Sequence, residues 1–307
     1  MNVYSSVREM IGNTPVLKLN QIAAAAGIDP KVGLYAKLEL MNPAGSVKDR
    51  VGMYMIDDAK ERGILKEGGT IVDATAGNTG IGIAIAALNQ GFRVIFTVPE
   101  KFSVEKQKVM RALGAEIVHT PREEGMLGAD READRIIAKI PGAISLKQFN
   151  NPANPKAHYE TTGPEIYQQL DGQIDIFVAG AGSGGTFSGV VKYLKEQNSG
   201  IQGVLADPLG SIIGGGEHFD YDIEGIGNDF IADTMDITLV DQVIKISDSE
   251  AFDTARLLAK KEGILAGSSS GAALAAAIRL AKTLDHGNVV TIFPDRGDRY
   301  LSKGLFD

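Results

Sequence analysis

Short apolar runs alternate with longer helical runs along most of this 307-residue chain. The apolar runs contain few polar positions, which is typical of strands buried on both faces of a sheet. We therefore expect strands at 70–75, 93–99, 116–120, 174–180, 203–207, 242–246 and 288–294. Helical runs occupy 47–63, 78–91, 103–114, 125–139, 154–170, a stretch ending at 195, 249–263 and 269–284. This alternation predicts an α/β protein with twisted, mostly parallel sheets covered by helices.

A passage rich in proline and asparagine, FNNPANP at 149–155, separates two series of these strands and helices. We expect it to end a smaller N-terminal α/β domain over residues 41–149. A larger α/β domain would consist of residues 1–40 together with 150–307. The helical pattern resumes after the boundary, where Asn154 is the expected N-cap and Pro155 the first helical residue.

The composition restricts the function more than the fold. The chain has no cysteine, which excludes disulfides, thiolate nucleophiles and cysteine-bound zinc. Its four histidines have no ligand spacing, and we expect no metal site. A formal charge of −8 disfavours nucleic acids and anionic membranes as partners. With neither a signal peptide nor an apolar run long enough to cross a bilayer, the expected location is the cytoplasm.

Glycine and small polar residues are concentrated in three loops, each at a predicted strand-to-helix turn. In ATAGNTG, at 74–80, Asn78 and Thr79 can hydrogen-bond a ligand, although an ordinary capped turn explains the loop equally well. In GSSSGAALA, at 267–275, the three serines are likewise explained as helix caps. Ligands of parallel α/β sheets bind beyond the carboxyl ends of the strands, so a sheet edge could bring such loops together.

The third loop, GAGSGGTFSG at 180–189, carries the strongest ligand signal. It follows an apolar strand, and its backbone N–H groups at a helix start suit a phosphate. The loop also matches G-x-G-x-x-G at Gly180, Gly182 and Gly185, with Asp207 about 20 residues further on. That is the dinucleotide fingerprint, so an NAD-dependent oxidoreductase is a competing interpretation.

Lys48, within NPAGSVKDR at 42–50, lies where a helix disfavours positive charge. Ser46 is the expected N-cap of the helix that Val47 opens, which places Lys48 in the first turn, at the positive end of the helix dipole. Positions 51, 52, 55 and 59, on the same side of the helix, are apolar, so the lysine is expected to face packed protein. The alternative is a lysine whose stem reaches solvent from the helix end.

Dipole and desolvation together are expected to lower the pKa of an inward-facing Lys48, and such an amine is suited to forming a Schiff base. A phosphate loop with a Schiff-base lysine, and without a thiol or a metal cluster, indicates pyridoxal 5'-phosphate as cofactor. The oxidoreductase interpretation leaves Lys48, Asn78 and the serine loop without a role. A related scaffold that only binds a partner is a third hypothesis.

The chain resembles the cysteine synthase (O-acetylserine sulfhydrylase) and cystathionine β-synthase family over nearly its whole length. The resemblance is carried, in the family's order, by IGNTPVLKL, NPAGSVKDR, TAGNTG, QFNNPANP, GSGGTFSG, EGIG, GSSSGAA and FPDRGDRYLS. These enzymes depend on pyridoxal phosphate and have fold type II, the fold of the tryptophan synthase β subunit. The resemblance therefore implies this fold and a β-replacement reaction on a small amino acid.

The resemblance also implies a role for each matching residue. Lys48 would hold the cofactor as a Schiff base and move the Cα proton, Asn78 would hydrogen-bond the cofactor's 3′-oxygen, and Ser269 would meet its pyridine nitrogen. The phosphate would be bound by Gly182, Ser183, Gly184, Gly185 and Thr186. The substrate would be bound by Thr75, Ala76, Gly77, Asn78, Thr79 and Gln148, while Glu224, Gly225 and Gly227 line the site and take part in its closure.

Two departures from the family pattern concern the substrate. Ala76 stands where the family loop TSGNTG has a serine, and Asn228 stands where a tyrosine is common. EGIGNDFI and DPLGS are more similar to cystathionine β-synthases than to plain sulfhydrylases. We therefore expect O-acetylserine or serine as donor and the thiol homocysteine as acceptor, giving cystathionine, with sulfide giving cysteine as the alternative. The family further implies a homodimer, with serine acetyltransferase as a candidate partner.

Overall fold

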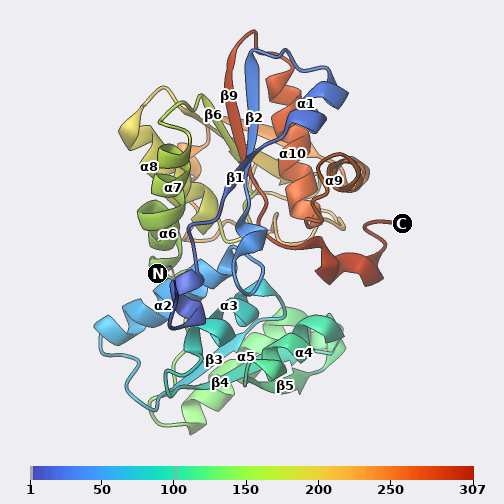
Figure 1. The fold of residues 1–307 in the computed structure, drawn as a ribbon. Coiled ribbons are helices and arrows are strands. Elements are labelled where there is room, and N and C mark those ends of the chain that lie inside the picture. The colour runs from blue at the N-terminus through green and yellow to red at the C-terminus, as the bar shows by residue number, and fades with distance from the viewer. Residues whose placement is uncertain (1–2, 101) are drawn as a thin grey trace. The chain divides into compact units, whose positions relative to one another are not determined.

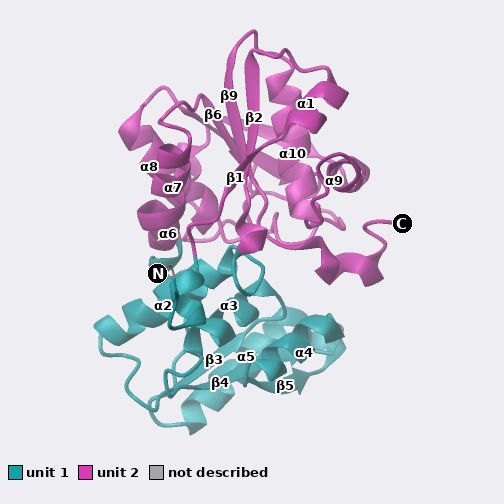
Figure 2. Cartoon of the chain, in the orientation of Figure 1, with its two compact units in different colours: residues 1–11, 42–154 teal, residues 12–41, 155–307 magenta. Residues whose placement is uncertain are grey.

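The structure is a computed structural model that describes residues 3–100 and 102–307. By its internal contacts the chain divides into two compact units (Figure 2). Unit 1 comprises residues 1–11 and 42–154, and unit 2 comprises residues 12–41 and 155–307. Met1, Asn2 and Lys101, which fall inside the predicted domain ranges, lie outside the described residues. The predicted domain limits stay a prediction, because a division by contacts does not test how either part folds alone.

Unit 1 is built on a parallel sheet with the strand order β3-β4-β5 (Figure 1). Its strands, β3 (Thr70–Ala74), β4 (Arg93–Pro99) and β5 (Glu116–Thr120), coincide with predicted apolar runs. Ile144 extends the sheet by one bridge beside β3, where its carbonyl accepts the N–H of Val72 at 2.8 Å. The helices are α2 (Lys48–Glu61), α3 (Asn78–Ala87), α4 (Val104–Ala112) and α5 (Gly125–Lys139), with 3-10 turns at Val7–Met10 and Arg122–Glu124.

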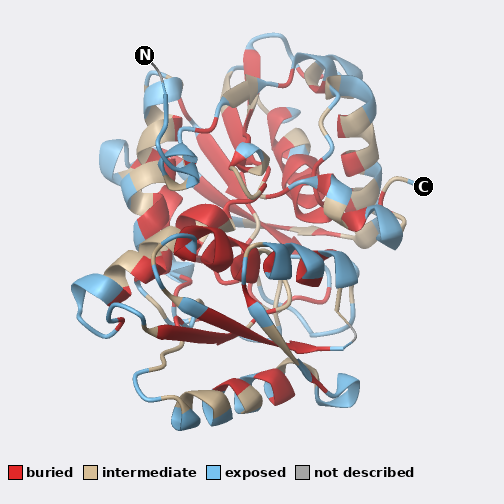
Figure 3. Ribbon diagram, turned by 60° about the horizontal axis from the view of Figure 1, so that its bottom comes forward, coloured by how far each residue is buried: buried red, intermediate tan, exposed pale blue. Residues whose placement is uncertain are grey.

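The core of unit 1 lies between its sheet and the pair α2 and α3. Every residue of α3 from Thr79 to Ala87 is buried, so this helix has no solvent-exposed face there. Met55 of α2 and Phe96 of β4 belong to the same apolar cluster and are fully buried. Figure 3 shows the buried strands in red and the outer turns of surface helices in pale blue. Packing therefore fixes α3 along nearly its whole length, including its start.

Unit 2 contains a larger sheet with the strand order β1-β2-β9-β6-β7-β8. Its strands are β1 (Val16–Lys18), β2 (Val32–Lys37), β6 (Ile176–Ala179), β7 (Gln202–Pro208), β8 (Gln242–Ile246) and β9 (Gly287–Ile292). All neighbouring strands are parallel except β1, which runs antiparallel to β2. The prediction of α/β architecture with mostly parallel sheets is confirmed. β1 and β2 were not predicted, because β1 is very short and Gly33 interrupts the apolar run of β2.

The helices of unit 2 are α1 (Asn20–Ala26), α7 (Gly163–Gln169), α8 (Gly185–Gln197), α9 (Asp248–Glu262) and α10 (Ser268–Ala281), with 3-10 turns at Glu39–Met41, Ile237–Leu239 and Gly297–Lys303. The helix predicted over 154–170 is instead three pieces: α6 (Ala153–Ala157), a π turn (His158–Thr162) and α7. The predicted cap is also wrong. The helix begins at Ala153, two residues before the predicted first helical residue. Asn151 Oδ1 accepts the N–H of Ala153 at 2.9 Å, while Asn154 Nδ2 donates to Gln148 O.

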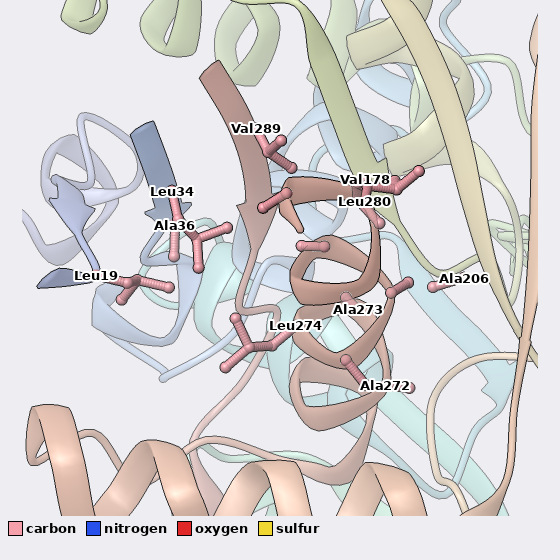
Figure 4. Close-up of a cluster of buried hydrophobic side chains, with 14 of the residues drawn as sticks. Leu19, Leu34, Ala36, Val178, Ala206, Ala272, Ala273, Leu274, Leu280 and Val289 are labelled. Carbon is pink, nitrogen blue, oxygen red and sulfur yellow. The ribbon is translucent and has the colours of Figure 1, made fainter. Parts of the chain in front are cut away.

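The core of unit 2 forms around α10, which is buried along most of its length. Its many alanines allow the helix to lie close to the sheet. Figure 4 shows this helix presenting side chains toward β2, β6, β7 and β9, and the labelled cluster includes Ala272, Ala273, Leu274, Leu280, Leu34, Val178, Ala206 and Val289. Across the described residues, no helix is both long and apolar enough to span a membrane.

A buried lysine ties β2 to α7 within unit 2. Lys37 is 0% exposed, and its Nζ donates to Thr14 O and to Glu165 Oε2, each at 2.6 Å. Gln169 Oε1 accepts a third bond from the same ammonium group at 2.8 Å. A buried charge is tolerated when its donors are satisfied in this way.

Candidate active site

Lys48 is the first residue of α2. The helix begins at Lys48, one residue later than predicted, with Val47 in place of Ser46 at the N-cap position. Ser46 still supports the helix start, because its Oγ accepts the N–H of Lys48 at 3.2 Å. The positions on the same side of α2 are buried, as predicted: Val51 and Met55 are 0% exposed. Lys48 itself is half-buried at the positive end of the helix.

The start of α2 is held against α3 by two glycines. A Cβ atom on Gly82 would lie 2.1 Å from the carbonyl oxygen of Lys48, and one on Gly52 would lie 2.3 Å from the carbonyl oxygen of Gly82. Only glycine permits this approach, since the opposing atoms are backbone. Gly82 lies one turn after Asn78 on the same face of α3. The glycine crossing therefore brings the backbone of Lys48 close to the helix face that carries Asn78.

The predicted substrate loop, Thr75–Thr79, joins β3 to α3. Thr75 and Thr79 are both buried, and Thr75 Oγ1 accepts the N–H of Gly80 at 3.1 Å. Thr79 Oγ1 donates to Gln148 Oε1 at 2.6 Å. Two segments 69 residues apart, both predicted to bind substrate, thus meet by a direct hydrogen bond. Ala76 and Gly77 are half-buried, and the Ala76 methyl packs on the core of unit 1.

Asp73, at the end of β3, anchors the segment that precedes Gln148. Its carboxylate accepts the Ser145 hydroxyl at 2.5 Å and the N–H of Leu146 at 3.1 Å. The next residue, Lys147, has a φ of +48°, which is uncommon outside glycine. Burial raises the pKa of the Asp73 carboxyl to about 6, and the hydrogen bonds from Ser145 and the backbone oppose this effect only in part. Asp73 was not among the predicted site residues.

The glycine loop at 180–186 connects β6 to α8 in unit 2. Gly184, with a φ of +81°, precedes the first residue of α8 and provides no side chain to cap the helix. The N–H groups of Gly184, Gly185 and Thr186 donate to no residue in the described part of the chain. By contrast, α4 and α9 are capped by the side chains of serines at 103 and 247. A helix start with backbone donors left over is suited to a phosphate.

The buried side chain of His158 contacts the end of this loop. His158 is 0% exposed, and its Nε2 lies 3.1 Å from Thr186 Oγ1. Its other ring nitrogen lies 2.9 Å from Thr162 Oγ1, within the π turn. The histidine therefore bridges two threonine hydroxyls, one of them in the predicted phosphate loop. Sequence reasoning gave His158 no role, because Thr186 is 28 residues away along the chain.

Unit 2 brings together three predicted elements: the glycine loop, the segment Glu224–Gly227 and Ser269. The N–H of Gly227 donates to Ala181 O at 2.7 Å, and the N–H of Glu224 donates to Ser268 Oγ at 3.0 Å. Ser269 is 4% exposed, yet its Oγ makes no hydrogen bond to any described residue. A Cβ on Gly225 would lie 4.0 Å from that oxygen.

The donor set of unit 2 fits the predicted cofactor. A phosphate can take the unused N–H groups at the start of α8, and a pyridine nitrogen can pair with the Ser269 hydroxyl. The acid of the dinucleotide fingerprint, Asp207, is in contrast 0% exposed, and its Oδ2 pairs with Lys245 Nζ at 2.5 Å. It is therefore not available to a ribose hydroxyl.

This combination of an α/β fold, a lysine at a helix start, a glycine-rich anion loop and a serine hydroxyl defines a pyridoxal-phosphate enzyme as the class of protein. Comparison with protein families agrees, because the family described as "Pyridoxal-phosphate dependent enzyme" matches residues 7–295. The chain belongs to this family. The predicted cofactor is thereby confirmed.

Two curated relatives and one solved structure are similar to the chain over its full length. An O-acetylserine dependent cystathionine beta-synthase of Bacillus subtilis is 49% identical, over 100% of this chain and 99% of the relative. A cysteine synthase of Helicobacter pylori is 46% identical, with 100% of both chains covered. The crystal structure of an O-acetylserine dependent cystathionine beta-synthase from Helicobacter pylori superposes with a TM-score of 0.93, at 46% identity and 100% coverage of both chains.

The roles predicted for individual residues stay predictions. Within unit 1 the structure joins Thr79 to Gln148, and within unit 2 it gathers the glycine loop, Glu224–Gly227 and Ser269. Sequence reasoning missed Asp73 and His158. For Asp73 a signal was present, since it is a charged residue at the end of an apolar strand, directly before a predicted ligand loop.

Proposed function

We propose that this enzyme replaces the β-substituent of O-acetylserine or serine with a thiol. Homocysteine is the preferred acceptor, and cystathionine is the product. The observation that carries the proposal is the 49% identity, over the whole chain, to a relative described as an O-acetylserine dependent cystathionine beta-synthase. A second candidate, cysteine synthesis from sulfide, is favoured by the 46% identity to a cysteine synthase.

Bound pyridoxal phosphate supplies the electron sink that acidifies the substrate Cα–H and allows the β-substituent to leave. The amine of Lys48 holds the cofactor and moves the Cα proton as general base and then as general acid. Its position at the start of α2 places this residue at the positive end of the helix dipole. Asn78 hydrogen-bonds the cofactor's 3′-oxygen.

In unit 2, Gly182, Ser183, Gly184, Gly185 and Thr186 bind the phosphate through N–H and hydroxyl donors. Ser269 meets the pyridine nitrogen with a hydroxyl. A hydroxyl does not stabilise a protonated pyridine as a carboxylate does, which favours loss of the β-substituent over transamination. The contact with His158 Nε2, at 3.1 Å, holds the Thr186 hydroxyl oxygen in place within the loop.

The substrate carboxylate binds to the loop Thr75–Thr79 and to Gln148. Because Gln148 Oε1 accepts the Thr79 hydroxyl, the amide is fixed with its N–H₂ group directed away from Thr79 and able to donate to an anion. Asp73 supports this arrangement by anchoring the preceding residues. Glu224, Gly225 and Gly227 line the site and take part in closure over the substrate.

We further propose a cytoplasmic homodimer that serine acetyltransferase is able to bind. The support is the family resemblance together with the full-length identity to the two curated relatives. Size-exclusion chromatography with light scattering, with and without a peptide of the acetyltransferase C-terminus, tests both parts. A monomer, or a dimer that ignores the peptide, contradicts the respective part.

The central experiment supplies O-acetylserine or serine, adds homocysteine or sulfide, and identifies the products by mass spectrometry. We expect cystathionine from O-acetylserine, and a visible absorbance band that borohydride abolishes. Lys48→Ala should eliminate both, whereas the control Lys66→Ala, at an exposed lysine, should change neither. Comparable turnover with sulfide defeats the preference for homocysteine. A spectrum that does not respond to O-acetylserine favours a non-catalytic scaffold.

A further inference from the structure

Two side chains hold the carbonyl oxygens of the predicted phosphate loop. Asn228 Nδ2 donates to Gly182 O at 3.1 Å, and Thr234 Oγ1 donates to Ser183 O at 2.5 Å. All four residues belong to unit 2. These are consecutive peptide groups, so two neighbouring peptide planes of the loop are each fastened by their carbonyl side.

Fastening a carbonyl also determines where the attached N–H group points. All peptide bonds of the described residues are trans, and in a trans peptide the C=O and N–H bonds point in opposite directions. The bond from Asn228 to Gly182 O therefore points the N–H of Ser183 in the opposite direction, away from Asn228. The bond from Thr234 to Ser183 O does the same for the N–H of Gly184. The loop thus has its carbonyls turned toward these two side chains and its N–H groups turned away from them.

Asn228 is itself firmly held. Its N–H donates to Ser211 Oγ at 3.2 Å, and its carbonyl accepts the N–H of Ile212 at 2.9 Å. The preceding residue, Gly227, donates its N–H to Ala181 O at 2.7 Å, directly beside the loop. The amide therefore extends from a fixed backbone rather than from a loose segment.

Thr234 is equally restrained, being 5% exposed. Its neighbour Met235 packs so closely on the loop that a Cβ on Gly184 would lie 2.4 Å from the Met235 Cβ. A hydroxyl in this position can orient the peptide group without moving itself. Both anchors are thus in place before any ligand binds, which lowers the cost of organising the donors.

We propose that Asn228 and Thr234 are positioning residues that orient the N–H groups of Ser183 and Gly184 toward the cofactor phosphate. The inference rests on the proposed function of residues 182–186 as the phosphate loop. A short amide reaches Gly182 O from a backbone that already lies beside the loop.

The test compares two ligands that differ only in the phosphate. Apoenzyme prepared from the holoenzyme is titrated with pyridoxal phosphate and with pyridoxal, and each Kd is measured by absorbance. Asn228→Leu and Thr234→Val keep the side-chain size but remove the donor. We expect each substitution to raise the Kd of pyridoxal phosphate about 10-fold, which is the effect of one lost charge-assisted hydrogen bond. The Kd of pyridoxal should change by less than about threefold. The phosphorus NMR signal of bound cofactor should shift in both variants.

Matched controls come from the same unit. Asn288 Nδ2 donates to Gln173 O at 2.9 Å, and Thr291 Oγ1 donates to Val178 O at 3.0 Å, both outside the loop. Asn288→Leu and Thr291→Val should leave the ratio of the two affinities unchanged. Thr234→Ser, which retains the hydroxyl, should restore most of the affinity for pyridoxal phosphate.

Equal losses for pyridoxal and pyridoxal phosphate would show a merely structural role and overturn the inference. Unchanged affinity in both variants, while wild type still prefers the phosphorylated compound, overturns the inference alone. If wild type shows no such preference, the phosphate role of the loop is wrong, and the proposed function of residues 182–186 falls together with the inference.

Discussion

Replacing Gly82 by alanine tests whether the glycine crossing of α2 and α3 holds Lys48 in place. The new methyl carbon would lie 2.1 Å from Lys48 O, whereas ordinary contact begins at 3.4 Å. The two helices must therefore separate by about 1.3 Å at this point. The opposing atoms are backbone, so no side chain can rotate to make room.

Two energetic effects of this substitution oppose each other. Alanine is favoured over glycine inside a helix by about 1 kcal/mol. Overpacking a rigid contact costs about 1–3 kcal/mol, and a purely backbone contact is at the upper end of that range. We expect a net loss of about 2 kcal/mol in the free energy of unfolding. A displacement of about 1 Å at a reacting group can lower the rate about 100-fold, so kcat should fall more than stability alone explains.

Urea unfolding followed by far-UV circular dichroism measures the first effect, and steady-state kinetics under fully folded conditions measures the second. Gly200→Ala is the control, because its Cβ would meet only the Asn198 side chain, at 3.2 Å. If Gly82→Ala is as stable as wild type and retains full kcat, the crossing tolerates a methyl group, and the reasoning that it positions Lys48 is refuted.

Three further substitutions test the buried polar groups. Burial raises the pKa of Asp73 from 3.8 in the unfolded chain to about 6 in the folded one. Ionising Asp73 therefore lowers the free energy of unfolding by up to about 3 kcal/mol above pH 6, and the effect disappears below pH 3.8. The free energy of unfolding of wild type, compared with that of Asp73→Asn, should fall as the pH rises from about 4 to 7. A difference between the two proteins that does not depend on pH contradicts this prediction. Lys37→Met removes the ammonium that pairs with Glu165, and it should lower the free energy of urea unfolding by about 3 kcal/mol. A loss under about 1 kcal/mol speaks against a stabilising buried pair. His158→Phe should lower the affinity for pyridoxal phosphate about fivefold, measured by equilibrium dialysis, because the Thr186 hydroxyl loses its partner. Unchanged affinity would show that His158 does not support the loop.

Most of the parallel strands were predictable from their apolar runs, whereas β2 was not. The runs at Arg93–Pro99 and Ile176–Ala179 are almost entirely buried and apolar enough to be identified without tertiary information. The π turn at His158–Thr162 was not, since its residues continue a helical pattern and only packing determines where the extra residue is accommodated. Local sequence predicts an element's type better than its interruptions.

The candidate site shows the same division. Lys48 and the glycine loop were recognisable, because an unusual charge at a helix start and a dense run of glycines are local signals. His158 was not, because its partner Thr186 is 28 residues away along the chain. Asp73 is conspicuous as a charged residue at the end of an apolar strand, but its anchoring role depends on Ser145, 72 residues away. Family resemblance supplied the roles of Asn78 and Ser269, which no physical pattern in the sequence required.

The π turn has a consequence for what the chain tolerates in evolution. One residue added to an α-helix rotates everything beyond it by about 100°. His158, at the start of the π turn, contacts Thr186. Glu165, in α7 after the turn, pairs with Lys37. We expect deletion of one residue of the turn to rotate Glu165 relative to His158, so that the two contacts could not form together. The number of residues in the turn is therefore constrained more tightly than the identity of those residues in it that make neither contact.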